Sequence, residues 1–168
     1  MSYLRSMIDN IKGDEKMDNP VSQDAIRFLN TIVGHPVLYA HKSPDTELYD
    51  FGFGNFVEIV DWKGRRRQVA SLTVHALCRF QVIWRKERRV SSFYEDTPVR
   101  KFDSKIQPLI GQKVKRIALS EKNDFWLDFG DCWMVFATHE NGEESWRFFA
   151  TAEDLPHFVA ADSWVDFS

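Results

Sequence analysis

The residues best placed to do chemistry are an aspartate and an arginine that each occur twice. Asp50 lies in YDFG and Asp128 in LDFG, while Arg79 lies in CRF and Arg147 in WRF. Such residues could clamp a ligand or act as acid and cation in catalysis, but opposite charges on neighbouring strands also fix strand register. One active site seldom needs two copies of each group, so we expect structural pairs made of Asp50, Arg79, Asp128 and Arg147.

The remaining polar residues match no catalytic, metal or cofactor motif. GxSxG, the P-loop and GxGxxG do not occur, and the glycine-rich run at residues 51–55 joins two predicted strands instead of opening a helix. His75 and Cys78 lie three apart on a predicted strand, so they point to opposite faces. The sequence therefore predicts no catalytic residue, no metal ligand and no cofactor, and it leaves enzymatic activity open.

Basic and aromatic residues are interleaved at two places, and acidic residues gather at a third. Trp62 and Trp84 each precede a cluster of arginines, a combination that can hold phosphates and stack bases. Basic turns between strands are also common where they only face solvent. The candidate partner-binding residues are Trp62, Arg65, Arg66, Arg67, Arg85, Arg88, Arg89, Glu140, Glu143 and Glu144.

Charge is partitioned along the chain, although the net charge is only −3. Residues 1–62 carry −5, residues 63–116 carry +11 and residues 117–168 carry −9. The basic middle could bind an acidic partner, or the acidic thirds of the same fold could neutralise it. Binding to a protein partner is expected first, and binding to nucleic acid second.

Cysteine usage and hydropathy suggest a compartment. Cys78 and Cys132 lie in apolar strand patterns outside any CxxC pair, which is typical of buried free thiols in a reducing environment. The chain has no apolar run long enough to span a membrane, and its first residues lack the pattern of a secretory signal. We expect a cytoplasmic protein without a membrane partner, and the oligomeric state stays open.

Several landmarks recur at nearly constant spacing, which predicts an internal duplication. IVG, YDFG and KG in the first copy match LIG, LDFG and NG in the second. The predicted organisation is a flexible N-terminal arm (1–18), two α+β units (19–92 and 93–150) and a C-terminal tail packed on the sheet (151–168), with a helical turn at 152–155.

Hydrophobic periodicity gives the elements of each unit. The first has a helix at 25–33, strands at 37–41, 48–51 and 56–62, and a long alternating strand at 71–84 that must bend. The second has a helix at 102–110, deformed by Pro108, then strands at 114–119, 125–129, 133–138 and 145–149, with a hairpin turn at Asn141-Gly142. The predicted fold class is α+β, mainly antiparallel sheet with two flanking helices.

The run TVHALCRFQVIWRKERRV, read with LDFG and NGEESWRFF, resembles a pattern in small bacterial proteins, some of which look like immunity partners in toxin–immunity loci. The resemblance covers residues 69–150 and departs from the pattern at Phe80-Gln81-Val82. It implies a protein-binding domain that neutralises a partner by charge-steered association. The alternatives are a nucleic-acid-binding module using the arginine turns, and a small-molecule-binding or enzymatic domain with a cleft between the repeats.

Overall fold

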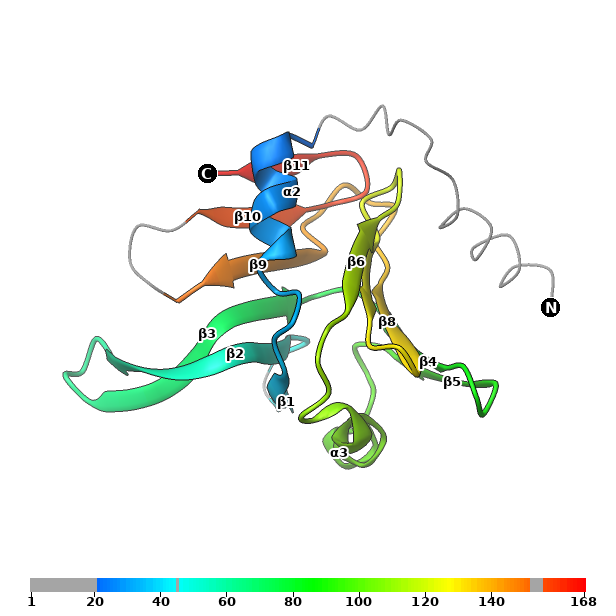
Figure 1. Ribbon diagram of the computed structural model, residues 1–168, viewed down its shortest axis with the longest axis horizontal. Coiled ribbons are helices and arrows are strands. Elements are labelled where there is room, and N and C mark those ends of the chain that lie inside the picture. Colours follow the sequence, from blue (N-terminus) through cyan, green and yellow to red (C-terminus); the bar gives the residue numbers. More distant parts are fainter. Residues whose placement is uncertain (1–20, 45, 152–155) are drawn as a thin grey trace.

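The computed structural model describes residues 21–44, 46–151 and 156–168, and it is an α+β fold dominated by antiparallel sheet (Figure 1). The expected arm at 1–18 and the helical turn at 152–155 lie outside the described residues. One sheet has six strands, in the order β1 (Val37–Lys42), β2 (Tyr49–Val60), β3 (Arg66–Ala76), β9 (Trp146–Ala150), β10 (His157–Ala160) and β11 (Val165–Phe167).

The second sheet has five strands that run across those of the first in Figure 1. Their order is β5 (Arg89–Phe93), β4 (Phe80–Trp84), β8 (Cys132–Phe136), β7 (Phe125–Asp128) and β6 (Arg116–Leu119). The chain therefore makes a three-stranded meander and then crosses into the other sheet, first from β3 to β4 and later from β8 to β9. The two predicted units exchange their last strands.

Two short helices cover the core between the sheets. In α2 (Gln23–Asn30), Ser22 caps the first turn by accepting a hydrogen bond from the Ala25 N–H, and Phe28 packs on Phe148 of β9. In α3 (Val99–Ile106), Phe102 and Ile106 are buried, and the chain continues as a 3₁₀ turn (Gln107–Leu109) that contains Pro108. Both predicted helices are confirmed, including the deformation at Pro108.

Aromatic side chains fill the region where the chain crosses between the sheets. Tyr49 of β2 meets Phe80 of β4 with ring centroids 4.9 Å apart, and Phe125 of β7 stacks on Trp146 of β9 at 4.7 Å. All four residues are buried. Each contact joins one sheet to the other, so a single apolar core contains residues from both units.

The long strand predicted at 71–84 is wrong as a single strand. It divides at Leu77–Arg79, where β3 ends in one sheet and β4 begins in the other. The two crossovers are hydrogen-bonded to their surroundings and to each other, since the Leu77 N–H donates to the Ser145 carbonyl and the Ala137 N–H donates to that of Arg79. The alternation of apolar and polar residues continues through the break because β3 and β4 both bury every second residue.

The hairpin predicted at Asn141-Gly142 is also wrong. The strands on either side, β8 and β9, belong to different sheets, and this turn lies within a crossover. Its local chemistry is still that of a turn, because Gly142 has φ +73° and the Glu143 N–H donates to the Asn141 side chain. The tail contributes β10 and β11, which extend the six-stranded sheet beyond β9.

The strands predicted separately at 48–51 and 56–62 form the one strand β2. A bulge interrupts its register with β3 between Phe53 and Phe56. Gly54 there has φ +90°, and a Cβ atom would lie 2.3 Å from the Ser71 side-chain oxygen. Only glycine fits this position, which lets the strand continue past the body of the protein.

Candidate protein-binding site

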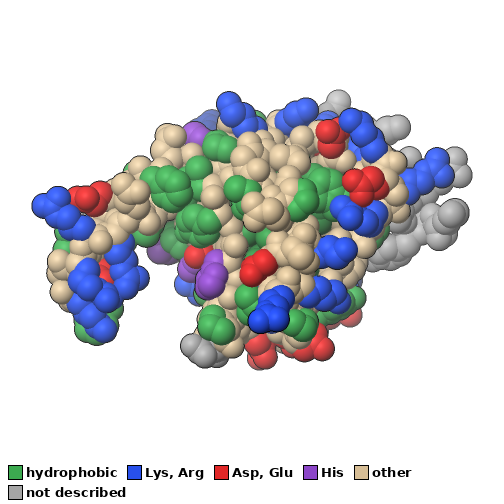
Figure 2. All heavy atoms as spheres, turned by 90° about the horizontal axis from the view of Figure 1, so that it is seen from below, with side chains coloured by type: hydrophobic (Ala, Val, Ile, Leu, Met, Phe, Trp, Pro, Cys, Tyr) green, Lys and Arg blue, Asp and Glu red, His purple; other side chains and the backbone are tan. Residues whose placement is uncertain are grey.

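Beyond the bulge, β2 and β3 leave the body as a two-stranded projection, which we call the β-finger (residues 56–70). Within the described part of the chain its strands pair only with each other, from Phe56 with Ala70 to Val60 with Arg66. The pairing of β1 with β2 ends at Phe53, and that of β9 with β3 ends at Leu72. Figures 1 and 2 show the β-finger standing away from the rest of the molecule, and Figure 2 shows Lys and Arg side chains at its end.

The apolar residues of β2 continue onto the β-finger past the end of the core. Val74 and Leu72 of β3 lie in the core, and beyond the bulge Phe56 pairs with Ala70, which is buried but outside the core cluster. Phe56 is 54% exposed and Val60, on the same face, is 65% exposed. Trp62 follows in the turn and is 88% exposed. Glu58 lies between Phe56 and Val60 on this face and is exposed as well. Large apolar side chains are thus exposed beyond the end of the core, with one carboxylate among them.

The tip of the β-finger is built around Asp61. Its carboxylate accepts hydrogen bonds from the backbone N–H groups of Lys63 and Arg65, and it forms ion pairs with Arg65 (2.8 Å) and Arg67 (3.1 Å). The backbone N–H of Arg65 and these other donors hold the pKa of Asp61 below its usual value. Arg66 pairs with Glu58 at 3.1 Å. The three arginines predicted to bind a partner therefore hold the hairpin together.

One cation of the tip is left without an acidic partner in the described chain. The Lys63 ammonium lies over the Trp62 ring, 4.5 Å from its centroid. Together with the arginines, it makes the end of the β-finger basic while Trp62 remains accessible.

The arginines of the β4–β5 turn lie elsewhere and are occupied. Arg85 pairs with Asp128 at 3.0 Å and stacks over Trp133 at 4.0 Å, and Arg89 pairs with Glu87 and lies over Trp84. Arg88 has φ +49°, a turn conformation. The β4–β5 turn and the β-finger are on opposite sides of Figure 1, so the two predicted basic clusters do not form one surface.

The predicted acidic residues sit on the β8–β9 crossover. Glu140 pairs with Lys122 at 3.1 Å, Glu143 accepts from the Asn141 amide, and Glu144 holds the Arg147 guanidinium through contacts of 2.6 and 2.7 Å. Only Glu144 is partly buried. These contacts are local, and they do not join the acidic residues to either basic cluster.

The repeated Asp and Arg residues do not occupy equivalent places. The first paired residues after the β1–β2 and β6–β7 turns are Tyr49 and Phe125, so Asp128 corresponds to Gly52 and not to Asp50. Burial acts to raise the pKa of Asp128, but bonds from the Arg116 side chain and the Gly130 N–H outweigh it, and the pKa lies below its usual value.

Arg116 faces Asp128 across the strand pair, so the ion-pair partners of Asp128 are Arg116 and Arg85. Arg147 pairs with Glu144, and Arg79 forms no ion pair with a described residue. Among the described residues, neither Asp50 nor Asp128 therefore forms the expected ion pair with Arg79 or Arg147.

Asp50 instead lies between His41 and His75 on the outer face of the six-stranded sheet. Burial raises the pKa of Asp50 to about 6 and lowers that of His75. The His75 Nε2 atom is 3.7 Å from the Asp50 Oδ1 atom, which is too long for a hydrogen bond. Among the described residues, no group of three or more His, Cys, Asp or Glu side chains is arranged to hold a metal ion.

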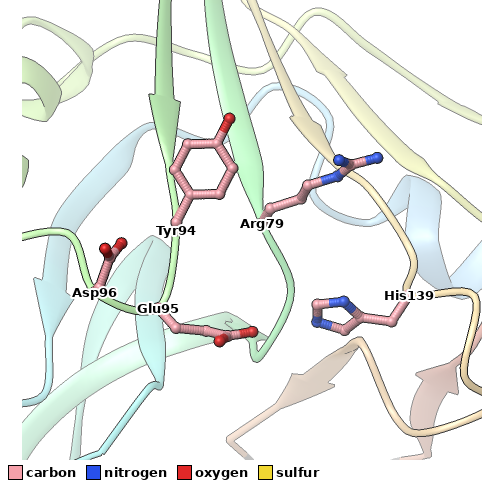
Figure 3. Close-up of a pocket in the computed structure, with 5 residues that line it drawn as sticks. All are labelled: Arg79, Tyr94, Glu95, Asp96 and His139. Carbon is pink, nitrogen blue, oxygen red and sulfur yellow. The ribbon is translucent and has the colours of Figure 1, made fainter.

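A hollow of about 430 Å³ lies beside the crossovers and is lined by Arg79, Tyr94, Glu95, Asp96 and His139. The Nζ atom of the buried Lys42 anchors its wall by donating to the carbonyls of Glu95 and Thr97. Figure 3 shows the Arg79 guanidinium pointing away from both carboxylates, while Glu95 extends toward His139. These side chains do not converge on a common point, as a catalytic or small-molecule site requires.

No family model, curated protein or solved structure matches the chain. Within the described residues, the helices are all too short or too polar to cross a bilayer. Both cysteines are buried free thiols, as expected, and burial raises the pKa of each to about 12.

Sequence reasoning identified Trp62 and missed Phe56 and Val60. Both lie in the strand predicted at 56–62, and neither is among the predicted partner-binding residues. The available signal was the spacing: the alternation of β2 continues on both sides of FGFGN to the Lys63-Gly64 turn, which makes the hairpin longer than its neighbours.

Proposed function

We propose that the protein is a protein-binding module whose contact element is the β-finger. The observation that carries this proposal is the exposure of three large apolar side chains, Phe56, Val60 and Trp62, on a hairpin that projects beyond the core. Exposed tryptophans and large apolar residues on a projecting element are typical binding hot spots.

The basic end of the β-finger specifies the chemistry of the partner. Lys63 has no acidic partner in the described chain, and Arg65, Arg66 and Arg67 add positive charge around Trp62. The complementary surface is an apolar pocket with an acidic rim on another protein. Opposite charges would steer the association, and burial of the Trp62 ring would supply most of the affinity.

Nucleic acid is the less favoured partner because the finger arginines are committed to acids. Arg65 and Arg67 share Asp61, and Arg66 holds Glu58, so binding phosphates would require breaking contacts that maintain the hairpin. Phe56 and Val60 have no counterpart in a phosphate backbone. Basic residues that serve nucleic acids are usually free to replace counterions.

An immunity-type inhibitor is the specific form of this function that the sequence resemblance suggests. Such a protein blocks its target by occupying a surface, so it needs a contact element and no catalytic constellation. The two buried free thiols support a reducing compartment, and we place this function in the cytoplasm.

The test is capture of a partner from host lysate by the tagged protein, compared with Trp62→Ser and Val60→Ser variants. We expect one stoichiometric protein to be captured by the wild type. Its affinity should fall about thirtyfold or more in Trp62→Ser, the loss typical of a hot-spot residue. Trp164→Ser and Val33→Ser are matched controls, since both residues are exposed but lie outside the β-finger.

Retention of the same protein by the β-finger variants would contradict the proposal. Capture of nucleic acid alone, lost on raising the salt concentration and on mutating Arg66 but not Val60, would replace it with the nucleic-acid alternative.

A further inference from the structure

A second surface, separate from the β-finger, is the outer edge of β5. This strand is the last in the five-stranded sheet, and among the described residues it pairs only with β4. In an antiparallel edge strand, every second residue directs its backbone N–H and C=O away from the sheet. Such an edge is a template on which another extended chain can pair.

A groove of about 330 Å³ runs beside this edge. One wall is Arg89–Phe93 with Tyr94, and the other carries Lys101 and Lys105 of α3. Phe93 and Phe102 are both buried and pack with ring centroids 5.6 Å apart, which fixes the position of the helix relative to the strand. The groove is therefore part of the folded body and needs no rearrangement to exist.

The helical wall of the groove is basic and unneutralised. Lys101 and Lys105 are exposed, and no described residue forms an ion pair with either. Residues four apart lie on the same side of a helix, so the two ammonium groups face the groove together. Figure 2, which views the α3 side, shows several Lys and Arg side chains on this part of the surface.

We propose that the groove binds an extended acidic segment of a partner protein, which adds to the sheet as a strand beside β5. The spacing supports this geometry: alternate residues of a strand lie about 7 Å apart on one face, and residues four apart on a helix are separated by about 6 Å along its axis. Carboxylates at positions i and i+2 of the segment can therefore meet Lys105 and Lys101, while its backbone pairs with the strand edge.

The probe is a labelled hexapeptide of alternating valine and glutamate, titrated into the full-length protein and followed by fluorescence anisotropy. We expect saturable binding that slows amide hydrogen exchange at residues 89–93. An alternating valine–lysine peptide should not bind. The valine–glutamate peptide with a central proline should bind about tenfold or more weakly, because it cannot complete the ladder.

The variants Lys101→Glu and Lys105→Glu should each weaken peptide binding about fivefold, the loss expected for one exposed ion pair. Lys113→Glu is the matched control, since Lys113 is exposed, follows α3 and does not line the groove. Trp62→Ser should leave peptide binding unchanged. The groove proposal is therefore tested independently of the proposal that the β-finger binds a protein.

Three results would overturn the proposal. Equal binding of the proline-containing peptide would mean attraction by charge alone. Binding insensitive to both lysine reversals would place the peptide elsewhere. Slow exchange, before peptide is added, at those N–H groups of residues 89–93 that point away from β4 would mean that the edge is already occupied, by the chain itself or by a second copy.

Discussion

The tip of the β-finger and the β4–β5 turn have similar sequences, but their side chains differ in exposure and in contacts. Each has a tryptophan at the end of a strand followed by a cluster of arginines. Trp84 is 7% exposed and Trp62 is 88% exposed. Arg85, beside Trp84, contacts Asp128 and Trp133 of neighbouring strands, whereas the ion pairs of the arginines beside Trp62 are with acids of their own hairpin.

The difference comes from what lies beside each hairpin. β4 is bordered by β8, which brings Trp133 next to Ile83 and Cys132 next to Trp84. Beyond the bulge, β2 and β3 have no neighbouring strand, so their side chains find partners only within the hairpin. A turn with a tryptophan followed by arginines is therefore buried against the body or exposed for binding, depending on whether a strand distant in the sequence pairs beside it.

Truncating each of the two tryptophans gives the strongest test of this difference between the turns. Trp84→Ala should lower the free energy of unfolding by about 3–5 kcal/mol, because it leaves a cavity in a packed region. Trp62→Ala should change it by less than about 0.5 kcal/mol, as is usual for an exposed side chain. Urea denaturation followed by circular dichroism measures both. Similar losses for the two variants would mean that the β-finger packs against the body.

The second prediction compares the aspartates that organise the two hairpins. Asp128→Ala should lower the free energy of unfolding by about 2–3 kcal/mol, since it leaves Arg116 and Arg85 without their buried partner. Asp61→Ala should disorder the tip while leaving the urea midpoint nearly unchanged. Amide exchange at residues 61–65 reports the local effect. An unchanged midpoint for Asp128→Ala would contradict the structural role of this residue.

The third prediction separates the two aspartates of the repeated motif. Burial raises the pKa of Asp50 from its usual value of about 4 to about 6, so folding disfavours the charged carboxylate. The resulting destabilisation is complete above about pH 6 and absent below about pH 4. Asp50→Asn should therefore raise the free energy of unfolding by about 2 kcal/mol at pH 8.

Below about pH 4 the difference between Asp50→Asn and the wild type should vanish, and urea titrations from pH 4 to pH 8 test this. Asp128 should behave in the opposite way, because its pKa is lowered in the folded state and its stabilisation is lost as the pH falls. A pH-independent gain for Asp50→Asn would mean that burial of the charge is not the cause.

The smallest expected effect concerns the ion pairs of the β-finger. Arg66→Ala should lower the free energy of unfolding by less than about 0.5 kcal/mol, because both Arg66 and its partner Glu58 are largely exposed. Arg85→Ala is the matched change at the other turn. It should cost more, because it removes contacts to both Asp128 and Trp133.

The sequence predicted those features that depend on near neighbours. The two amphipathic helices, with Leu29 and Phe102 on their buried faces, and the turn at Gly142 follow from local chemistry. The fold class followed as well, because period-two alternation and two amphipathic segments allow little else.

What the sequence could not supply was the choice of neighbouring strands. Apolar and polar residues at 71–84 would alternate in the same way whether Val74 and Val82 belonged to one strand or to strands of two different sheets. Asn141-Gly142 likewise turns the chain equally well in a hairpin or in a crossover. The exposure of Phe56 and Val60 depends on where β1 and β9 stop pairing, which no local pattern records. The candidate site was therefore predicted only at Trp62 and its arginines.

The exchange of strands between the two units also constrains the order of assembly during synthesis. β3 gains its neighbour β9 late, and the hydrogen bond from the Thr151 hydroxyl to the Ala70 carbonyl joins residues 81 positions apart. Until β9 emerges, a nascent chain presents an open β3 edge that other chains can pair with. Closing such a long loop is slow, so this protein should depend on dilution or chaperones more than a sheet of sequential hairpins would.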